Sequence, residues 1–299
     1  MNLLSSNDLS KEQIEKIFGI ADDLGSGKEE ASIKEGSILA LFFQKPSTRT
    51  RVSFEAAMAQ LGGTTIYIDA MTSQASRGET FSDTSRILSG YCDFIAARLN
   101  SHDDIIEMAT SSSVPVINAL TDLEHPTQAL ADIYTVRAHR RNLRGTKIAF
   151  MGDIATNTAN SLMVTAAKLG VEVSLVGPKN YAPNTTYFNK AREYATVYVH
   201  DTPEEGLDDA DIIYTDTFVS MGQEKEAEER RRLFAPYQVN AHALELAKED
   251  ALVMHCLPAH RGEEITDDVI DGPRSIVWEQ AKNKMLIAKA VLLFLSLER

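Results

Sequence analysis

Short apolar runs that alternate with helical stretches constrain the fold of this 299-residue chain more than any other feature. The runs expected as strands form a first set at residues 37–43, 64–69, 93–97 and 115–119, and a second set at residues 146–153, 171–178, 196–200, 211–216, 251–258 and 274–278. Helical stretches between them include residues 81–91, 126–140, 157–169 and 241–250. Strands that alternate with helices form right-handed βαβ units and parallel sheets. The sequence therefore predicts an α/β fold with two successive parallel sheets, each flanked by helices.

A basic, polar stretch at residues 139–145 separates the two sets and predicts the domain boundary. We expect a first domain at residues 1–140 and a second at residues 141–279. Ser10 and Gln13 have the spacing of a capping box, which predicts that the first helix begins there. The C-terminal helix, residues 280–299, is apolar enough to pack back on the first domain, with the N- and C-terminal helices together. The charge-dense residues 222–232 are typical of a solvated helix face.

The charge and the cysteine content exclude several classes of protein. Forty-three acidic and 30 basic residues give a formal charge of −13, which repels nucleic acids and anionic membranes. No apolar run approaches the roughly 20 residues of a membrane helix, and the N-terminus lacks the features of a signal or transit peptide. Two cysteines, Cys92 and Cys256, are too few for a disulfide framework. We expect a cytoplasmic protein, and its charge still permits a small anionic ligand where basic groups are concentrated locally.

Residues 43–51, FQKPSTRTR, carry the strongest chemical signal, because they link an expected strand to an expected helix. A helix N-terminus exposes unpaired N–H groups and the positive end of the helix dipole. The hydroxyls of Ser47, Thr48 and Thr50 and the guanidinium of Arg49 add donors that suit a phosphate. Taken alone, the segment fits an ordinary helix cap with surface arginines equally well. Walker and dinucleotide-binding glycine motifs are absent from the sequence, so neither ATP nor NAD is expected.

Two other segments carry polar groups where a strand or helix begins or ends. His125 and Gln128 open an expected helix, where they could polarise a carbonyl and bind an –NH2 group, although a helix cap explains them as well. Asp216 ends an expected strand and could bind a substrate ammonium, although a local turn is the simpler interpretation of that segment alone.

The segment HCLPAHR follows a further strand, at the edge of the sheet where α/β proteins bind ligands. Its His255 and Cys256 are adjacent in an expected strand and should therefore point to opposite faces. A second Cys/His pair with suitable spacing is absent from the sequence, and a closed zinc site needs about four ligands. We expect no metal.

Together these segments resemble the transcarbamoylase family. FQKPSTRTRVSFEAAMAQLGG and HPTQALAD resemble its two carbamoyl-phosphate signatures. TDTFVSMGQE and HCLPAHRGEE are similar to the motifs of its ornithine-using branch, whereas the Thr-Arg-x-Gln and Pro-Leu-Pro-Arg segments of the aspartate-using branch do not occur. The resemblance implies transfer of the carbamoyl group of carbamoyl phosphate to the δ-amine of L-ornithine, giving L-citrulline and phosphate in arginine metabolism. It also implies a homotrimer, or a multiple of one, that needs no cofactor.

The resemblance further implies a role for each residue that matches a family motif. The residues implied to bind carbamoyl phosphate are Ser47, Thr48, Arg49, Thr50, Gln74, Arg98, His125, Gln128, Cys256, Leu257 and Lys284, with Gln74 reaching the site of a neighbouring subunit. The residues implied to bind ornithine are Asn157, Asp216, Ser220 and Met221, with Asn160 as an alternative to Asn157. The implied catalytic residues are Arg98, His125, Asp216 and Cys256. Lys284 stands where the family usually has an arginine, which keeps the charge and loses the planar fork.

Two alternatives to this function stay open on the sequence. A carbamoyltransferase with another amine acceptor, such as putrescine or lysine, could arise from single substitutions near Asp216. A catalytically silent binding protein would also keep a carbamoyl-phosphate site. The presence of Arg49, His125, Asp216 and Cys256 argues against the silent protein, because simple binding needs no group that stabilises developing charge.

Overall fold

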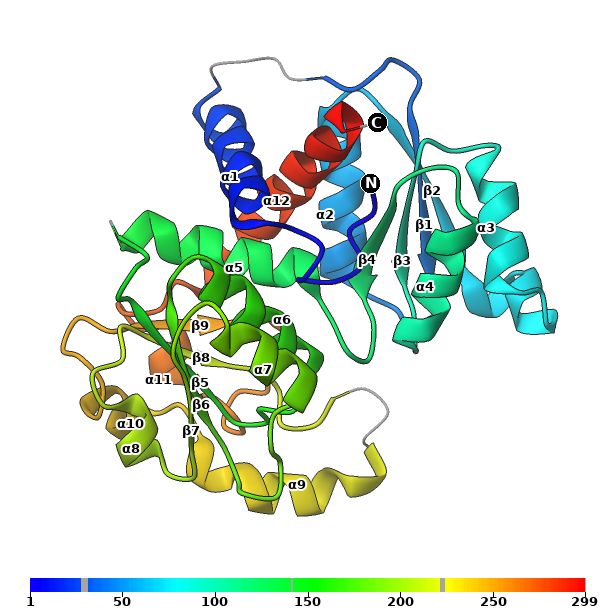
Figure 1. Cartoon of the computed structure of the whole chain (residues 1–299). Coiled ribbons are helices and arrows are strands. Elements are labelled where there is room, and N and C mark those ends of the chain that lie inside the picture. Colours follow the sequence, from blue (N-terminus) through cyan, green and yellow to red (C-terminus); the bar gives the residue numbers. More distant parts are fainter. Residues whose placement is uncertain (28–31, 141, 221–223, 299) are drawn as a thin grey trace. The chain divides into compact units, whose positions relative to one another are not determined.

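The computed structural model of the chain describes residues 1–27, 32–140, 142–220 and 224–298 (Figure 1). These residues form two compact units. Unit 1 comprises Met1–Ala131 and Asn283–Arg299, and unit 2 comprises Asp132–Lys282. The borders between the units therefore fall inside two helices, α5 (Pro126–His139) and α12 (Val277–Leu297).

Unit 1 contains a parallel sheet of four strands, in the order β2-β1-β3-β4. The strands are β1 (Ile38–Phe43), β2 (Thr64–Asp69), β3 (Phe94–Arg98) and β4 (Val116–Leu120). All three pairings are parallel, and Phe43 of β1 lies beside Asp69 of β2 and Arg98 of β3. The first set of expected strands is thus confirmed, together with the parallel sheet. Because parallel neighbours end at the same edge, the residues that follow β1 and β3 are brought close together.

Helices precede the strands of this sheet or connect them in the sequence. They are α1 (Lys11–Ser26), α2 (Thr48–Gln60), α3 (Phe81–Ser89) and α4 (His102–Ser111), with short 3₁₀ helices η1 (Ala70–Thr72) and η2 (Gln74–Arg77). The predicted capping box is present, because Ser10 accepts from the Gln13 N–H and Gln13 accepts from the Ser10 N–H. The N- and C-terminal helices pack together as expected, since Lys16 of α1 donates to Glu298 at 2.7 Å and lies over the ring of Phe294 of α12.

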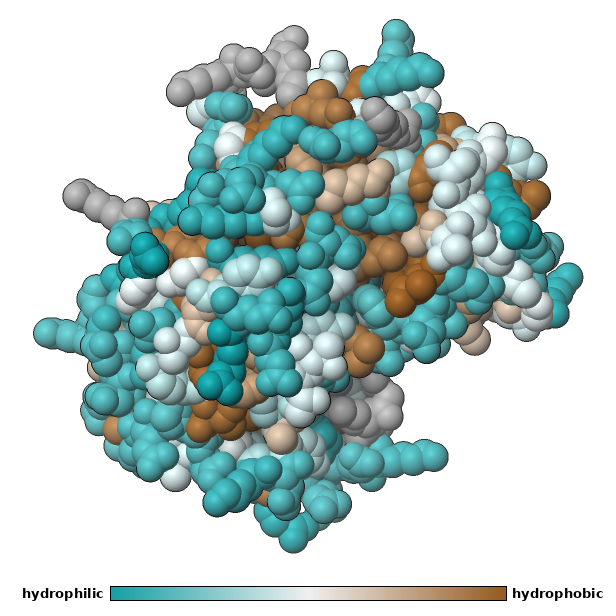
Figure 2. Space-filling model, viewed as in Figure 1, coloured by the Kyte–Doolittle hydropathy of each residue, from teal (hydrophilic) through white to brown (hydrophobic). Residues whose placement is uncertain are grey.

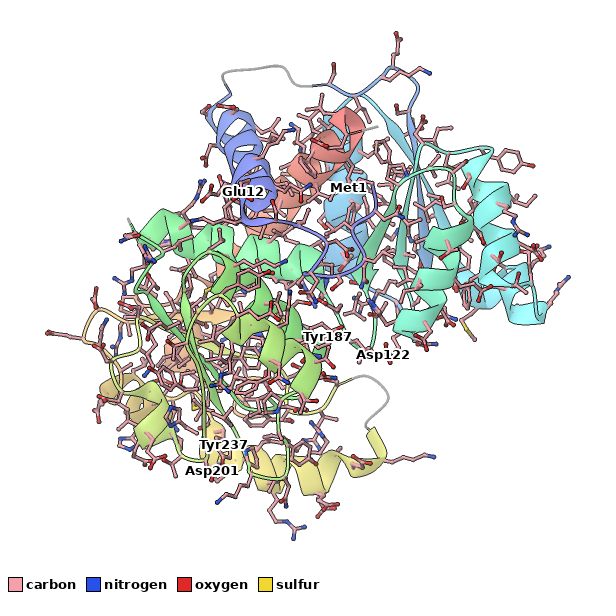
Figure 3. All side chains as sticks on the ribbon, viewed as in Figure 1. Met1, Glu12, Asp122, Tyr187, Asp201 and Tyr237 are labelled. Atoms are coloured by element: carbon pink, nitrogen blue, oxygen red, sulfur yellow. The ribbon has the colours of Figure 1, made fainter. Side chains whose placement is uncertain are left out.

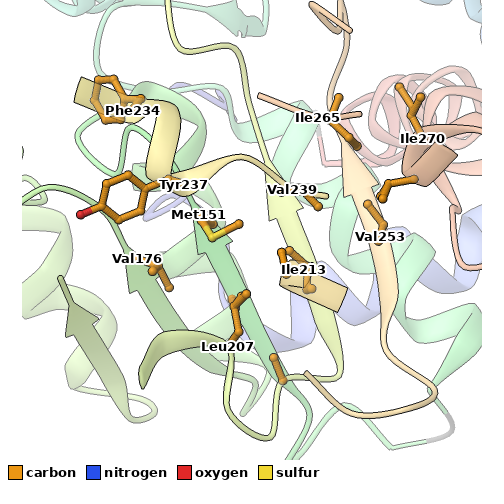
Figure 4. Packing of buried hydrophobic residues seen from close by; sticks show 14 of the residues in the cluster. Met151, Val176, Leu207, Ile213, Phe234, Tyr237, Val239, Val253, Ile265 and Ile270 are labelled. Carbon is orange, nitrogen blue, oxygen red and sulfur yellow. The ribbon is translucent and has the colours of Figure 1, made fainter. Parts of the chain in front are cut away.

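Unit 2 contains a second parallel sheet, in the order β7-β6-β5-β8-β9. Its strands are β5 (Lys147–Met151), β6 (Glu172–Val176), β7 (Val197–His200), β8 (Ile212–Thr215) and β9 (Leu252–His255). Figure 4 shows one side of its core, where Met151, Ile213 and Val253 project from three neighbouring strands. The prediction of a strand at residues 274–278 is wrong. Ser275 makes a single bridge to Val253, and the chain enters α12 at Val277.

The helices of unit 2 depart from the sequence expectations in two places. They are α6 (Asn157–Lys168), α7 (Thr185–Arg192), α8 (Pro203–Leu207), α9 (Ala227–Phe234), α10 (Ala241–Glu245) and α11 (Asp267–Ile270), with η3 (Glu224–Glu226) and η4 (Ala235–Tyr237). The helix expected over residues 241–250 ends at Glu245, because the Lys248 N–H donates to the Ala210 carbonyl instead. Residues 222 and 223 of the expected solvated face lie outside the described residues. On α9 the charged residues Glu228, Glu229, Arg231 and Arg232 are exposed as expected, whereas Arg230 is only 2% exposed.

The surface is mainly hydrophilic on the face that Figure 2 shows, with hydrophobic residues in small scattered groups. Some surface segments are held together by hydrogen bonds between side chain and backbone. In unit 2 the Tyr237 hydroxyl donates to the Asp201 carbonyl at 2.6 Å (Figure 3). None of the described helices has the length and apolar character to cross a membrane.

Candidate functional site

The first part of the site is the N-terminus of α2, directly after β1. Ser47 is the N-cap of this helix, and its Oγ accepts from the Thr50 N–H at 3.3 Å. Thr48 and Arg49 are exposed on the first turn, whereas Thr50 is buried. The two interpretations of this segment are therefore compatible. Ser47 caps the helix, and the same turn presents hydroxyl groups and an arginine where a helix N-terminus favours an anion.

Arg98 ends β3 beside the end of β1, and its guanidinium is almost completely buried. Its Nε has no hydrogen-bond partner, and no carboxylate forms an ion pair with it, among the residues that the structure describes. Burial, together with the nearby charge of Arg49, lowers the pKa of Arg98 to about 10. The side chain is still a cation at neutral pH. A buried cation with an unused donor makes this edge of the sheet favourable for an anionic ligand.

His125 and Gln128 lie at the start of α5, where Lys284 of α12 contacts both. The Lys284 Nζ donates to the Gln128 Oε1 at 2.7 Å and lies 3.4 Å from the His125 Nε2. All three side chains are buried. Burial, and then the charges of Lys284 and Arg98, hold the pKa of His125 well below its usual value. The imidazole is therefore neutral near pH 7, and it can donate a hydrogen bond without adding a third positive charge.

Gln74 is on η2, after β2, with an exposed side chain. It lines a shallow cavity in unit 1 with Phe42, Ile68 and Glu79. The contacts that the structure describes do not connect Gln74 to the cluster formed by Arg98, His125 and Lys284.

In unit 2 the predicted residues lie at the carboxyl ends of three adjacent strands. Asn157 begins α6 after β5, Asp216 follows β8, and Cys256 follows β9. Ligand atoms of Asp216, His255 and Cys256 all lie within 4.8 Å of one another. This is the edge at which parallel α/β sheets bind ligands. Asn157 is half-buried and Asn160 is buried one turn further along α6.

The expected opposite orientation of His255 and Cys256 is wrong. β9 ends at His255, so the alternation of a strand does not extend to Cys256, and both side chains approach Asp216. His255 is fully buried, with its Nε2 3.0 Å from the Glu264 Oε1 and its Nδ1 accepting from the Leu257 N–H at 2.9 Å. Both ring nitrogens are therefore engaged, so a metal would have to break one of these contacts to bind His255.

Leu257 adopts a left-handed backbone conformation, with φ 58°. Glu264 helps to hold this turn, because its carboxylate contacts His255 and also accepts from the His260 N–H at 2.5 Å. The sequence analysis missed Glu264. Its place in HCLPAHRGEE, nine residues after His255, gives no local sign of the contact.

The segment after Asp216 has a buried anchor that the sequence analysis also missed. The Arg230 guanidinium forms an ion pair with Asp153 and donates from its Nε to the Phe218 carbonyl at 2.7 Å. Arg230 and Asp153 are both buried, and the Phe218 ring stacks on Phe234 of α9. This anchor fixes the backbone two residues after Asp216. Ser220 is half-buried on the same segment, whereas Met221 lies outside the described residues.

A second buried network supports the same strand ends. The Tyr214 hydroxyl donates to the Asp132 Oδ2 at 2.9 Å, and the Gln280 Nε2 donates to the Asp132 Oδ1 at 2.7 Å. Gln280 also accepts from the His255 N–H at 2.9 Å. Burial, and then the neighbouring charge of Asp132, raises the pKa of Tyr214 well above its usual value, so the phenol stays protonated. The network ties β8 and β9, which carry Asp216 and Cys256, to α5 and α12.

The two clusters have complementary chemistry. In unit 1, buried Arg98 and Lys284, the α2 N-terminus and a neutral histidine suit a phosphate attached to a polarisable carbonyl. In unit 2, a carboxylate and a thiol at the edge of the sheet suit an amine.

Comparisons with known proteins bear on both units. Models of the aspartate/ornithine carbamoyltransferase family match residues 1–138, as its carbamoyl-P binding domain, and residues 144–295, as its Asp/Orn binding domain. The anabolic ornithine carbamoyltransferase of Pyrococcus furiosus is 47% identical over 97% of this chain and 95% of its own length. The ornithine carbamoyltransferase of Bacillus subtilis is 46% identical over 97% of this chain and 92% of its own.

Solved structures give the same likeness. The structure of ornithine carbamoyltransferase from Pyrococcus furiosus has a TM-score of 0.92 at 46% identity, and the match covers 97% of this chain and 95% of that one. The anabolic ornithine carbamoyltransferase of Campylobacter jejuni has a TM-score of 0.93 at 36% identity, over 100% of this chain and 99% of that one.

Proposed function

Because the chain belongs to the aspartate/ornithine carbamoyltransferase family, we propose that it transfers the carbamoyl group of carbamoyl phosphate to the δ-amine of L-ornithine. The products are L-citrulline and phosphate, and the reaction serves arginine synthesis. The domain at residues 1–140, with the C-terminal helix at residues 280–299, binds carbamoyl phosphate. The domain at residues 141–279 binds ornithine.

In the carbamoyl-phosphate domain, the α2 N-terminus binds the phosphate through Ser47, Thr48, Arg49 and Thr50. Arg98 contacts both the phosphate and the carbonyl oxygen, a role supported by its buried, unused Nε donor. His125 donates to the carbonyl oxygen as a neutral imidazole, in keeping with its lowered pKa. Gln128 and the main-chain carbonyls of Cys256 and Leu257 accept from the carbamoyl –NH2. Lys284 acts on this site through Gln128 and His125, which it contacts directly.

In the ornithine domain, Asp216 and Cys256 bind the δ-amine, and the short separation of their side chains supports this pairing. Asn157, Ser220 and Met221 bind the α-carboxylate and α-amino groups. An acid and a thiol suit a cationic side chain, whereas arginines would suit the second carboxylate of aspartate.

The reaction is a direct acyl transfer. The δ-ammonium group, with a lysine-like pKa near 10 in water, first loses one proton to solvent, and the neutral amine then attacks the carbamoyl carbon, forming the C–N bond. Negative charge then grows on the carbonyl oxygen, where Thr50, Arg98 and His125 donate hydrogen bonds. Loss of one such donor typically lowers the rate about 10²–10³-fold. The C–O bond to phosphate breaks, and the departing phosphate takes up the second proton, which the attacking nitrogen releases.

We also propose a homotrimer, or a multiple of one, in which Gln74 reaches a neighbouring subunit's site. Large apolar side chains that are exposed on unit 1 support an interface there: Val52, Ile66, Met71, Ile87 and Tyr91. Ile66 lies on β2, the outermost strand of its sheet. We place the protein in the cytoplasm, since its two cysteines, Cys92 and Cys256, are too few for the disulfide framework of a small secreted domain. Light scattering that shows a fully active monomer would contradict the trimer.

The observation that carries the proposed function is the presence of two clusters in one chain, one suited to a carbonyl-bearing phosphate and one suited to an amine. The test measures carbamoylated product from carbamoyl phosphate with ornithine, putrescine, lysine and aspartate in parallel. Turnover with ornithine alone is expected. Preference for another amine would refute the acceptor assignment. Tight carbamoyl phosphate binding in calorimetry without turnover of any amine would indicate a silent binding protein.

A further inference from the structure

The N-terminal segment of the chain extends the sheet of unit 1 beyond β4. The Leu3 N–H donates to the Val116 carbonyl at 2.9 Å, and the Asn118 N–H donates to the Leu3 carbonyl at 2.8 Å. Leu3 forms a parallel bridge with Ile117, and Figure 1 shows the segment running along β4. The Asn2 Oδ1 also accepts from the Val116 N–H at 2.9 Å. Residues 2–6, which we call the N-terminal strap, are therefore ordered by main-chain pairing.

The strap ends on a buried carboxylate. Glu124 is fully buried, and the Ser5 Oγ donates to its Oε1 at 2.6 Å while the Ser6 Oγ donates to its Oε2 at 2.7 Å. The Ser6 N–H lies 3.3 Å from both oxygens. A buried carboxylate is costly unless hydrogen bonds compensate it, and bonds to an ionised group are short and strong. The strap supplies such bonds to both oxygens.

Glu124 directly precedes His125, so this contact bears on the site. The Glu124 carbonyl accepts from the Thr121 N–H at 2.9 Å, and the Glu124 N–H donates to the Thr121 Oγ1 at 3.2 Å, which closes a tight turn. The His125 carbonyl then accepts from the Gln128 N–H at 3.0 Å, in the first turn of α5. Glu124 is thus fixed through its backbone on one side and its side chain on the other, and any shift of this residue moves His125.

We propose that Glu124, held by Ser5 and Ser6, is a positioning residue that sets where the His125 imidazole meets the carbonyl of carbamoyl phosphate. The inference rests on the role of His125 in the proposed function. It gives Ser5 and Ser6 a positioning role in catalysis through Glu124, although neither contacts the reacting atoms.

The test compares Ser6→Ala and Glu124→Gln with the wild-type protein. Ser6→Ala is expected to lower kcat and kcat/KM for carbamoyl phosphate together by about tenfold, because misplacement of a catalytic group by about 1 Å can cost up to 10²-fold. Ser6→Ala in the Glu124→Gln background should lower kcat less than twofold further, since both changes remove the same contact. Histidine ring resonances in NMR, assigned with His125→Asn, should show that the signal of His125 moves in Ser6→Ala.

The matched control is Asn2→Ala, which weakens the docking of the same strap at Val116 and leaves Glu124 untouched. It should keep the wild-type kcat and the wild-type His125 resonance. Equal losses in Asn2→Ala and Ser6→Ala would overturn the inference in favour of general docking of the strap, as would a wild-type kcat in both Ser6→Ala and Glu124→Gln. If the wild-type protein makes no citrulline, the proposed function fails and the NMR comparison still decides whether Glu124 positions His125.

Discussion

Arg230→Met tests whether the buried anchor of unit 2 stabilises the fold through charge. Methionine keeps a long, unbranched side chain among Tyr181, Phe218 and Phe234, but it removes the cation that faces Asp153 and the donor to the Phe218 carbonyl. Both members of the ion pair are almost completely inaccessible to water. Removing one member of such a pair typically costs about 3–5 kcal/mol, because the other charge is left buried and uncompensated. For a domain of this size that corresponds to a fall in Tm of roughly 6–20 °C.

The measurement is urea unfolding followed by circular dichroism, with the free energy of unfolding compared at unchanged m-value. The control is Arg232→Met on the same helix, where the side chain is exposed and the change should stay within about 0.5 kcal/mol. Arg230→Met with Asp153→Asn should recover about 2 kcal/mol, since the pair is then replaced by two neutral groups. A loss below about 1 kcal/mol in Arg230→Met alone would refute the reasoning, and so would a double variant no more stable than the single one.

Three further predictions concern the site. Arg98→Leu should raise the Tm of the ligand-free protein, because the lowered pKa of Arg98, about 10, indicates that its buried charge is unfavourable. The same change should abolish stabilisation by added phosphate. A Tm of the ligand-free variant below that of the wild type in scanning calorimetry would contradict this prediction. The pKa of folded His125 lies below the usual 6.5, so its contribution to stability is complete above pH 6.5 and is lost as the pH falls below that value. Lys284→Met should raise the NMR titration midpoint of His125 and reduce the loss of stability at acid pH. An unchanged midpoint would exclude Lys284 as a cause of the lowered pKa. Cys256→Ser should lower kcat and raise the KM for ornithine while leaving carbamoyl phosphate affinity in calorimetry unchanged, and the reverse pattern would assign the thiol another role.

Features that depend on neighbouring residues were predictable from the sequence. The capping box of α1 needs only Ser10 and Gln13, three residues apart, and it is present. The first four strands follow from apolar runs bounded by polar or glycine-containing segments, and each is present within one or two residues of its expected ends. The position of residues 44–47 between β1 and α2 follows from the same local pattern.

Features that depend on partners distant in the chain were not predictable. Residues 274–278 have the composition of a strand, but the sheet of unit 2 takes only a bridge from Ser275 before α12 begins. Arg230 lies in a charge-dense stretch, and only the position of Asp153, 77 residues earlier, shows that it is buried. Lys284 contacts His125 although the two residues are 159 positions apart in the sequence, and no local sequence pattern predicts this contact. A sequence pattern states which groups are present, whereas burial and pairing are decided by the tertiary fold.

The packing of α1 against α12 has a consequence for how the protein is made. Unit 2 is continuous in sequence, so all of its parts are available once Lys282 has been synthesised. Most of unit 1 precedes unit 2 in the sequence, but unit 1 also needs residues 283–299, which are synthesised after unit 2, to cover α1 and to supply Lys284. At about 5–20 residues per second, the first part of unit 1 waits roughly 10–30 s for its final helix. We therefore expect unit 1 to finish folding after unit 2, and nascent chains without α12 to expose the apolar face of α1 to chaperones.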